Sequence, residues 1–295
     1  MTTTLLDGKI ASEAFKNEIA AKVTKLKEQG KRAPHLAAIL VGTDGASETY
    51  VASKERSCVQ VGFNSTLLRF PETLTENELL LEIEKINNNN EIDGLIVQLP
   101  LPKHIDEEKI TDAILPSKDV DGFHTYNAGQ LSKGMDTFIP ATPFGIVKLL
   151  KYYNIETKGK NVVVIGRSMI VGRPMSILLS SSNSDYGNAT VTLAHRYTKN
   201  LEGFTKNADI VVVAVGIPFF LKKEMVKEGA VVIDVGITRV EDKTKKRGFR
   251  LAGDVDFENV KEVASYITPV PGGVGLMTIL GLLENTLQAY QTKHG

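Results

Sequence analysis

A tyrosine and a lysine four residues apart, Tyr50 and Lys54, are the side chains of this chain best suited to chemistry on a flat ring. The run around them, residues 45–54, contains no proline and favours a helix, on which such a pair emerges on one face. A stacking ring and a movable proton carrier would then face the same pocket. The alternative is that Tyr50 is a half-buried aromatic and Lys54 a solvated helix lysine.

A second pattern joins a buried strand, a glycine-containing turn and a helix. The apolar run 162–165 leads directly into Gly166, and Gly172 follows six residues later at the start of a predicted helix. This order places backbone N–H groups and a helix N-terminus against a phosphate. The glycine spacing differs from the usual G-x-G-x-x-G, so a tight strand–helix turn without a ligand is the alternative.

The end of the next strand indicates which dinucleotide would bind. An NAD site uses an acidic residue there for the ribose hydroxyls, whereas the 2′-phosphate of NADP requires positive charge. This chain has Arg196 and no carboxylate at that point. Arg196 and Arg167 could clamp the phosphate, with hydroxyls from Ser168 or Thr198. The pattern favours NADP, and the alternative is that Arg196 is a solvated loop charge.

Two further polar positions belong with Lys54. Gln98 ends an apolar strand, which the next prolines stop, and an amide at such a point often faces the crevice beyond the strand. Asp121 lies in a glycine-containing turn, and a second glycine-rich turn covers residues 272–275. Taken singly, Asp121 is explained as a turn former and the glycines as the start of a helix.

Composition excludes several classes of partner. The chain has 35 basic and 35 acidic residues, so no global positive field favours nucleic acid or an anionic membrane, and small molecules are expected. Cys58 is the only cysteine, which excludes an internal disulfide and favours packing over a nucleophilic role. The five histidines have no ligand spacing, so we expect no metal. Neither a signal peptide nor a membrane span is apparent, and a soluble cytoplasmic protein is expected.

The apolar pattern alternates between the periods of strands and helices. Its length of 295 residues predicts two domains. Strands are predicted at residues 36–41, 65–68, 94–97, 162–165, 189–194, 210–214 and 230–235, and helices at 10–29, 45–54, 171–181, 202–206 and 276–291. Thr75 and Glu78 form a possible capping box for another helix. Residues 241–250 are expected to be an exposed hairpin or loop. The fold class is α/β, with parallel sheets covered on both faces.

Five segments together resemble the bifunctional methylenetetrahydrofolate dehydrogenase/methenyltetrahydrofolate cyclohydrolase family over essentially the whole chain. The matching segments are Tyr50-Val51-x-x-Lys54, Asp93-Gly94-x-x-Val97-Gln98-Leu99-Pro100-Leu101-Pro102, Lys118-Asp119-Val120-Asp121-Gly122, Gly166-Arg167-Ser168-x-x-Val171-Gly172-x-Pro174 and Thr268-Pro269-Val270-Pro271-Gly272-Gly273-Val274-Gly275. Two positions depart from the family pattern. Ala141 replaces a cysteine, and Leu276 replaces a proline after the last motif.

The resemblance implies roles for individual residues. Lys54 would transfer the proton, Tyr50 would be the ring platform, Gln98 would hydrogen-bond Lys54, and Asp121 would accept from the pterin edge. The implied folate-binding residues are Tyr50, Val97, Gln98, Leu99, Pro100, Asp121, Pro271, Gly272 and Gly273. The implied NADP-binding residues are Gly166, Arg167, Ser168, Val171, Gly172, His195, Arg196, Thr198, Gly216 and Ile237. Physical logic supports the lysine, because burial would lower its pKa and a neutral amide could orient it.

The resemblance also implies the activity and the architecture. A catalytic folate domain of residues 1–141, to which the C-terminal helix 276–295 returns, would adjoin a Rossmann-type NADP domain of residues 142–275, with a cleft between them. The enzyme would oxidise 5,10-methylenetetrahydrofolate with NADP and hydrolyse the methenyl product to 10-formyltetrahydrofolate. A cytoplasmic homodimer in one-carbon metabolism and purine biosynthesis is implied. The alternatives are a folate dehydrogenase without the hydrolase, another NADP-dependent dehydrogenase of small metabolites, and a non-catalytic dinucleotide-binding module.

Overall fold

The chain forms two compact units in the computed structural model, which describes every residue except 1, 43–44, 183–185, 246–247 and 295. The six-stranded unit comprises Met1–Ser12 and Thr142–Thr278, and the three-stranded unit comprises Glu13–Ala141 and Ile279–Gly295. One boundary between the two units falls between Ala141 and Thr142. The first twelve residues differ from the prediction, because β1 (Thr4–Leu5) pairs with β11 (Tyr266–Ile267) of the six-stranded sheet.

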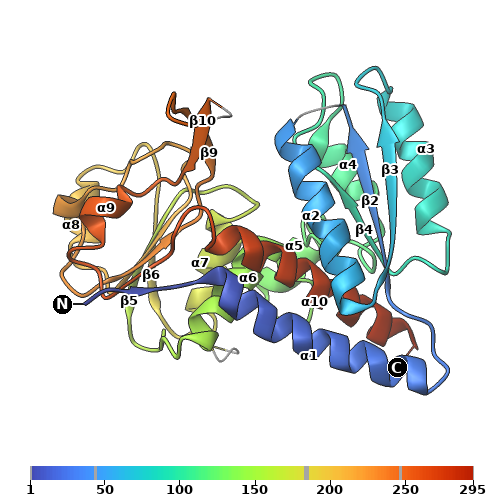
Figure 1. The fold of residues 1–295 in the computed structure, drawn as a ribbon, viewed down its shortest axis with the longest axis horizontal. Helices are drawn as coiled ribbons and strands as arrows, with labels where there is room; N and C mark the ends of the chain where they lie inside the picture. The colour runs from blue at the N-terminus through green and yellow to red at the C-terminus, as the bar shows by residue number, and fades with distance from the viewer. Residues whose placement is uncertain (1, 43–44, 183–185, 246–247, 295) are drawn as a thin grey trace. The chain divides into compact units, whose positions relative to one another are not determined.

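A parallel sheet in the order β3-β2-β4 is the centre of the three-stranded unit. Its elements are β2 (His35–Val41), β3 (Asn64–Phe70), β4 (Gly94–Val97), α2 (Gly45–Val61), α3 (Glu76–Asn87), α4 (Glu107–Ala113), α5 (Thr125–Ser132) and most of α1 (Gly8–Glu28) and α10 (Val274–His294). Figure 1 shows α2 and α3 on opposite sides of this sheet. Alternate residues of β2 therefore face different helices, which explains why nearly all of that strand is buried.

The core on one face of that sheet joins β2 and β4 to α3 and α4. Ile39 and Leu95 pack with Leu79, Ile83 and Ile110, all essentially inaccessible to solvent. The predicted capping box at the start of α3 is present: the Glu78 N–H donates to Thr75 Oγ1, and Glu78 Oε2 accepts from the Thr75 N–H at 2.8 Å. A fixed helix start secures the register of this apolar face.

A parallel sheet in the order β1-β11-β8-β7-β5-β6 forms the six-stranded unit. Its remaining elements are β5 (Asn161–Ile165), β6 (Thr190–Ala194), β7 (Ile210–Val213), β8 (Val231–Asp234), α6 (Ala141–Tyr152), α7 (Gly172–Ser180), α8 (Leu201–Thr205), the 3-10 helix η1 (Lys223–Met225) and α9 (Phe257–Val260). The strand order reverses at β5, which has β6 on one side and β7 on the other. Ligands of such sheets bind beyond the carboxyl ends at this reversal. The predicted α/β fold class with parallel sheets is confirmed.

An antiparallel hairpin interrupts the six-stranded unit after β8. It consists of β9 (Thr238–Glu241) and β10 (Phe249–Ala252), so the insert predicted as a hairpin or loop is a hairpin. The final helix is α10, and its residues from Ile279 onward belong to the three-stranded unit. Its first turn forms at Val274 although Leu276 replaces the family's proline.

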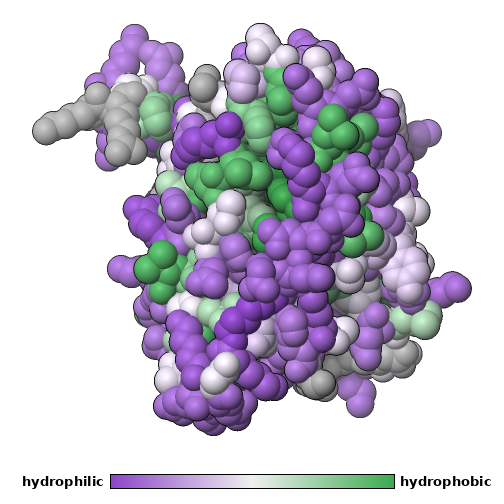
Figure 2. Space-filling model, turned by 90° about the vertical axis from the view of Figure 1, so that its right-hand side faces the viewer, coloured by the Kyte–Doolittle hydropathy of each residue, from purple (hydrophilic) through white to green (hydrophobic). Residues whose placement is uncertain are grey.

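The surface is mainly hydrophilic on the face turned to the viewer in Figure 2, with hydrophobic residues gathered in its upper half. Of the helices in the described ranges, none is both long and apolar enough to cross a membrane.

Candidate active site

Lys54 lies on α2 and is buried, with 6% of its surface exposed. Its Nζ donates to Gln98 Oε1 at 3.2 Å and lies 5.1 Å from the centroid of the Tyr50 ring. Helical spacing thus places Tyr50 and Lys54 on one face, and the end of β4 brings Gln98 to them. The solvated-lysine alternative is wrong for Lys54, because its amine is enclosed and hydrogen-bonded.

Lys54 and Asp121 perturb each other electrostatically. Burial lowers the pKa of the Lys54 ammonium, and the negative charge of Asp121 partly opposes this by raising it. Burial likewise raises the pKa of Asp121, and the Lys54 charge lowers it. Desolvation is the larger cause for both groups. A larger fraction of Lys54 is therefore neutral near pH 7 than for a free lysine, as general base chemistry requires.

Gln98 is held in one orientation by the backbone. Its own N–H donates to Ile39 O at 2.9 Å, which ties the residue to β2, and its side-chain Nε2 donates to Leu99 O at 2.7 Å. The amide nitrogen is thereby occupied, and the amide oxygen faces the Lys54 amine. Val97, the last residue of β4, is buried, whereas Pro100 is exposed just beyond Leu99.

The turn that contains Asp121 is positioned by Asp119 and Asn285, to which the sequence analysis assigned no role. Asp119 is buried and accepts from the N–H groups of Phe123 and His124 and from Asn127 Nδ2. Burial raises the pKa of Asp119 to about 7 despite these bonds. Asp119 occurs in the quoted motif, so the motif itself was a signal for it.

Asn285 of α10 secures the same turn from the other end of the chain. It is fully buried, and its Nδ2 donates to Val120 O and Ile139 O, both at 2.8 Å. Nothing in its local sequence marks it, because an asparagine in an apolar helix acquires this role only through tertiary contact. One amide thus joins Val120, the residue before Asp121, to the backbone at Ile139.

Cys58 lies one turn after Lys54 on the same helix and is buried. Burial raises the pKa of its thiol to about 12, which keeps the sulfur protonated at neutral pH. A protonated thiol is a poor nucleophile. The packing role predicted for Cys58 agrees with this environment.

The predicted dinucleotide turn follows β5 and is shaped by glycine. Gly166 has φ of 117°, and a Cβ there would lie 2.1 Å from Ala214 O. A Cβ at Gly172 would lie 1.9 Å from Gly166 O. The Ser168 hydroxyl accepts from the Val171 N–H at 3.1 Å and shapes the entry to α7. This close backbone approach at a helix N-terminus suits a pyrophosphate.

Two predicted phosphate-binding arginines converge on one exposed aromatic ring. The guanidinium carbons of Arg196 and Arg167 lie 4.8 Å and 5.8 Å from the centroid of Tyr197. The loop is closed by His195, whose N–H donates to Thr198 Oγ1 at 2.9 Å. Both arginines are exposed and so accessible to an anion. Their convergence adds to the case for a 2′-phosphate, because charge from two segments gathers at the end of β6.

The remaining predicted residues lie in loops of the six-stranded unit. Gly216 follows β7 with φ of 67°, and Ile237 follows β8 with 51% of its surface exposed. Pro271, Gly272 and Gly273 precede α10, and Gly272 O accepts from the Gly8 N–H at 2.9 Å. The three-stranded unit therefore holds Tyr50, Val97, Gln98, Leu99, Pro100 and Asp121, and the six-stranded unit holds the other predicted residues.

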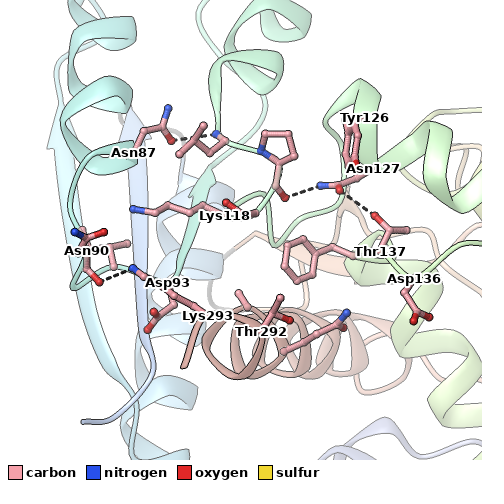
Figure 3. Close-up of a pocket in the computed structure, with 17 residues that line it drawn as sticks. Asn87, Asn90, Asp93, Lys118, Tyr126, Asn127, Asp136, Thr137, Thr292 and Lys293 are labelled. Atoms are coloured by element: carbon pink, nitrogen blue, oxygen red, sulfur yellow. Dashed lines mark hydrogen bonds between the residues drawn. The ribbon is translucent and has the colours of Figure 1, made fainter. Parts of the chain in front are cut away.

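A separate cavity of about 830 Å³ lies in the three-stranded unit (Figure 3). It is at the amino end of β4, near Asp93 and Lys118, whereas Gln98 follows the carboxyl end. Lys118 Nζ donates to Ile86 O and Asn89 O, and Lys293 Nζ donates to Asn90 O. Both amines thus secure carbonyl groups around the end of α3 and are structural. In the described part of the chain, no three His, Cys, Asp or Glu side chains are grouped to hold a metal ion.

Comparison with known families gives one match over the residues around Lys54 and another over the turn after β5. The catalytic-domain model of tetrahydrofolate dehydrogenase/cyclohydrolase matches residues 6–121, and its NAD(P)-binding-domain model matches residues 140–294. The chain belongs to the tetrahydrofolate dehydrogenase/cyclohydrolase family. The family predicted from the five motifs is thereby confirmed.

Relatives of this dehydrogenase/cyclohydrolase match it along nearly their whole length. It is 61% identical over 285 residues to the bifunctional protein FolD of Flavobacterium johnsoniae, covering 97% of this chain and 96% of the relative. The structure of a bifunctional FolD from Campylobacter jejuni has a TM-score of 0.91 at 46% identity, with 99% of each chain covered. A Trypanosoma brucei FolD complexed with NADP and an inhibitor has a TM-score of 0.93 at 36% identity, covering 99% of this chain and 98% of that one.

Proposed function

We propose that this protein oxidises 5,10-methylenetetrahydrofolate to the methenyl form with NADP and hydrolyses that product to 10-formyltetrahydrofolate. The observation that carries the proposal is the buried Lys54 amine between Gln98 and Tyr50, with Asp121 as its charge partner, in a member of this family. A dehydrogenase without hydrolase activity has no use for such an amine. The folate roles of these residues, and the assignment of the units as folate and NADP domains, are part of the proposal.

The residues of the six-stranded unit fit NADP. Gly166 and Gly172 leave room where side chains would collide with backbone, and Arg167 and Arg196 provide positive charge beside the same tyrosine ring. The backbone N–H groups of the turn and of α7 would hold the pyrophosphate, and the arginines the 2′-phosphate. When bound, NADP supplies the hydride acceptor, so no protein acid is needed for the oxidation.

Hydrolysis of the methenyl product requires proton management by the protein. A water oxygen forms a bond to the methenyl carbon, and the neutral Lys54 amine accepts the proton that the water loses. Ring opening then breaks the bond from that carbon to N5, while N5 gains a proton and the new hydroxyl loses one to become the formyl oxygen. Gln98 orients the amine, Tyr50 stacks on the pterin, and Asp121 accepts from its aminopyrimidine edge.

A spectrophotometric assay of the purified protein tests the proposed function. We expect reduced cofactor to form from methylenetetrahydrofolate with NADP at a higher kcat/KM than with NAD. We also expect added methenyltetrahydrofolate to lose its absorbance faster than in buffer. Oxidation without accelerated hydrolysis would indicate the dehydrogenase alone. Cofactor binding without either reaction would indicate a binding module.

Arg196→Ala is expected to weaken NADP binding roughly ten- to a hundredfold, because it removes charge-assisted hydrogen bonds to the 2′-phosphate. NAD lacks that phosphate and should lose little. Arg239→Ala is a matched control, because Arg239 also lies 4.8 Å from an aromatic centroid, in the β9–β10 hairpin. Titration calorimetry with both cofactors gives the comparison. Equal losses for NADP and NAD in Arg196→Ala would place Arg196 outside the phosphate site.

The proposal extends to a cytoplasmic homodimer that serves purine biosynthesis through 10-formyltetrahydrofolate. The family resemblance supports this extension. Sedimentation equilibrium of the purified protein should give twice the 32.2 kDa mass of the chain. A mass of one chain at micromolar concentration would contradict the dimer.

A further inference from the structure

Two buried aspartates lie at the carboxyl edge of the six-stranded sheet and have no role in the site described above. Asp234 ends β8, and Asp254 follows β10 by two residues. Their exposed fractions are 2% and 0%. Among the described residues, the donors to both carboxylates are backbone N–H groups. Carboxylates are rarely buried without a purpose, because desolvation of the charge is costly.

Asp254 binds the loop that follows β7. Its Oδ2 accepts from the Val215 N–H at 2.7 Å and from the Gly216 N–H at 2.9 Å. Gly216 is a candidate NADP-binding residue, and Ile217, the next residue, is 53% exposed. Two charge-assisted bonds to consecutive N–H groups fix the direction of this loop.

Asp254 also contacts the loop that follows β8. A Cβ at Gly236 would lie 2.3 Å from both Cγ and Oδ1 of Asp254, so the carboxylate lies directly against this glycine. Gly236 precedes Ile237, another candidate NADP-binding residue. Asp254 Oδ1 is buried and has no hydrogen-bond partner in the described structure. The carboxylate thus fills the space between the two loops, with one oxygen bonded to the first and the other packed against the second.

Asp234 holds the backbone of Asp254 in place. Asp234 Oδ1 accepts from the Asp254 N–H at 2.8 Å, and Oδ2 accepts from the Val255 N–H at 2.9 Å. Burial, with the added effect of the Asp254 charge, raises the pKa of Asp234 to about 7. A Cβ at Gly253 would lie 1.8 Å from Asp234 Oδ2, so the chain reaches Asp234 only because Gly253 has no side chain.

We propose that Asp254 is a positioning residue for the nicotinamide cofactor. Asp254 holds residues 215–217 and 236–238 in the conformation that binds NADP, and Asp234 holds Asp254 in place. This inference rests on the proposed function, and it assigns a role to residues that would not touch the cofactor. Loops fixed in advance lose less conformational freedom on binding, so the expected contribution is to NADP affinity. Hydrolysis should be independent of Asp254, because the proposed proton acceptor Lys54 and its partners Gln98 and Asp121 lie in the three-stranded unit.

The test compares three variants of the full chain with the wild type. Asp254→Ala removes the acceptor, Asp254→Asn keeps one oxygen acceptor and the volume, and Asp256→Asn is the matched control. Asp256 lies two residues further on and bonds Lys222 and Asn259 instead. Calorimetry gives the dissociation constant of NADP, and steady-state kinetics give KM for NADP, KM for folate and the hydrolysis rate.

For Asp254→Ala we expect at least a tenfold increase in the dissociation constant and KM of NADP, with folate KM and hydrolysis within twofold of wild type. Asp254→Asn should fall between Asp254→Ala and wild type, and Asp256→Asn should equal wild type. Unchanged NADP affinity in Asp254→Ala overturns the inference. Should Asp254→Ala lose both activities, the result for Asp254→Asn decides. A selective loss of NADP affinity in Asp254→Asn supports the inference. Unchanged NADP affinity, or a loss of hydrolysis as large as the loss of NADP affinity, overturns it. A wild-type protein that binds no NADP overturns the proposed function and this inference together, whereas the ratio of variant to wild type tests the inference alone.

Discussion

Lys54→Met is expected to slow the conversion of methenyl- to 10-formyltetrahydrofolate by about 10²–10⁴-fold, the usual contribution of a positioned general base. Methionine keeps much of the length of the side chain and removes the amine that accepts the proton from water. Oxidation of methylenetetrahydrofolate should be affected less, because hydride transfer needs no protein acid. Separate assays of the two half-reactions measure this split.

The pH profile of the wild type supplies a second readout for Lys54. Hydrolysis should increase as pH rises through the pKa of Lys54, because the neutral amine is the acceptor. Burial lowers that pKa, so the rise should occur below pH 10.5, the ordinary lysine value. The folded state also holds this proton less tightly than the unfolded chain, so a charged Lys54 costs stability below the unfolded pKa. Lys54→Met removes that cost and should not lower the unfolding midpoint at pH 7.

Lys16→Met is the matched control for this experiment. Lys16 is also buried in the three-stranded unit, and its Nζ donates to a glutamine oxygen, Gln60 Oε1, at 3.3 Å. Burial lowers its pKa as well. The control should hydrolyse the methenyl substrate at the wild-type rate. Wild-type hydrolysis in Lys54→Met, or an equal loss in Lys16→Met, would exclude Lys54 as the proton acceptor.

Asp121→Asn is expected to damage both reactions together, because both use the same bound pterin. A carboxylate can accept two hydrogen bonds from the aminopyrimidine edge, and asparagine replaces one acceptor with a donor that faces another donor. Folate affinity should fall roughly tenfold or more, as expected for the loss of a charge-assisted hydrogen bond. The dissociation constant and both rates are the measurements.

The same substitution should shift the pH profile of hydrolysis. The Asp121 charge raises the pKa of Lys54, so its removal should move the inflection to lower pH. Asp112→Asn is a suitable control, because that more exposed carboxylate accepts from Thr125, lies 4.0 Å from His124 Nδ1 and is outside the candidate site. Intact folate affinity with loss of hydrolysis alone would assign Asp121 to the proton relay instead of the pterin.

The long elements and the chemistry of the motifs could be predicted from sequence because their signals are local. The run 162–165 is apolar throughout and became β5, and the Tyr50–Lys54 spacing needs only a helix to place both on one face. The enclosure of Lys54 followed from the same reasoning, since an amine active near pH 7 requires burial. The charged residues of segment 241–250 predicted an exposed hairpin or a loop, and did not distinguish between these two structures.

Features that depend on contacts between distant segments had no local signal. Strands β1 and β11 have two residues each and form only by pairing with one another and with β8, so the first twelve residues were placed in the wrong unit. Asn285 and Asp254 looked ordinary in sequence, because their roles come from backbone groups 146 and 39 residues away.

The most direct test of the bifunctional account is a single progress curve recorded with the wild-type protein, methylenetetrahydrofolate and NADP. NADPH is followed by its fluorescence, and the methenyl intermediate is quantified by chromatography of samples withdrawn during the reaction. We expect NADPH to accumulate while the methenyl intermediate stays well below the amount of NADPH formed, because Lys54 hydrolyses it. Equal accumulation of the two, with methenyltetrahydrofolate decaying only at its rate in buffer, would contradict the account.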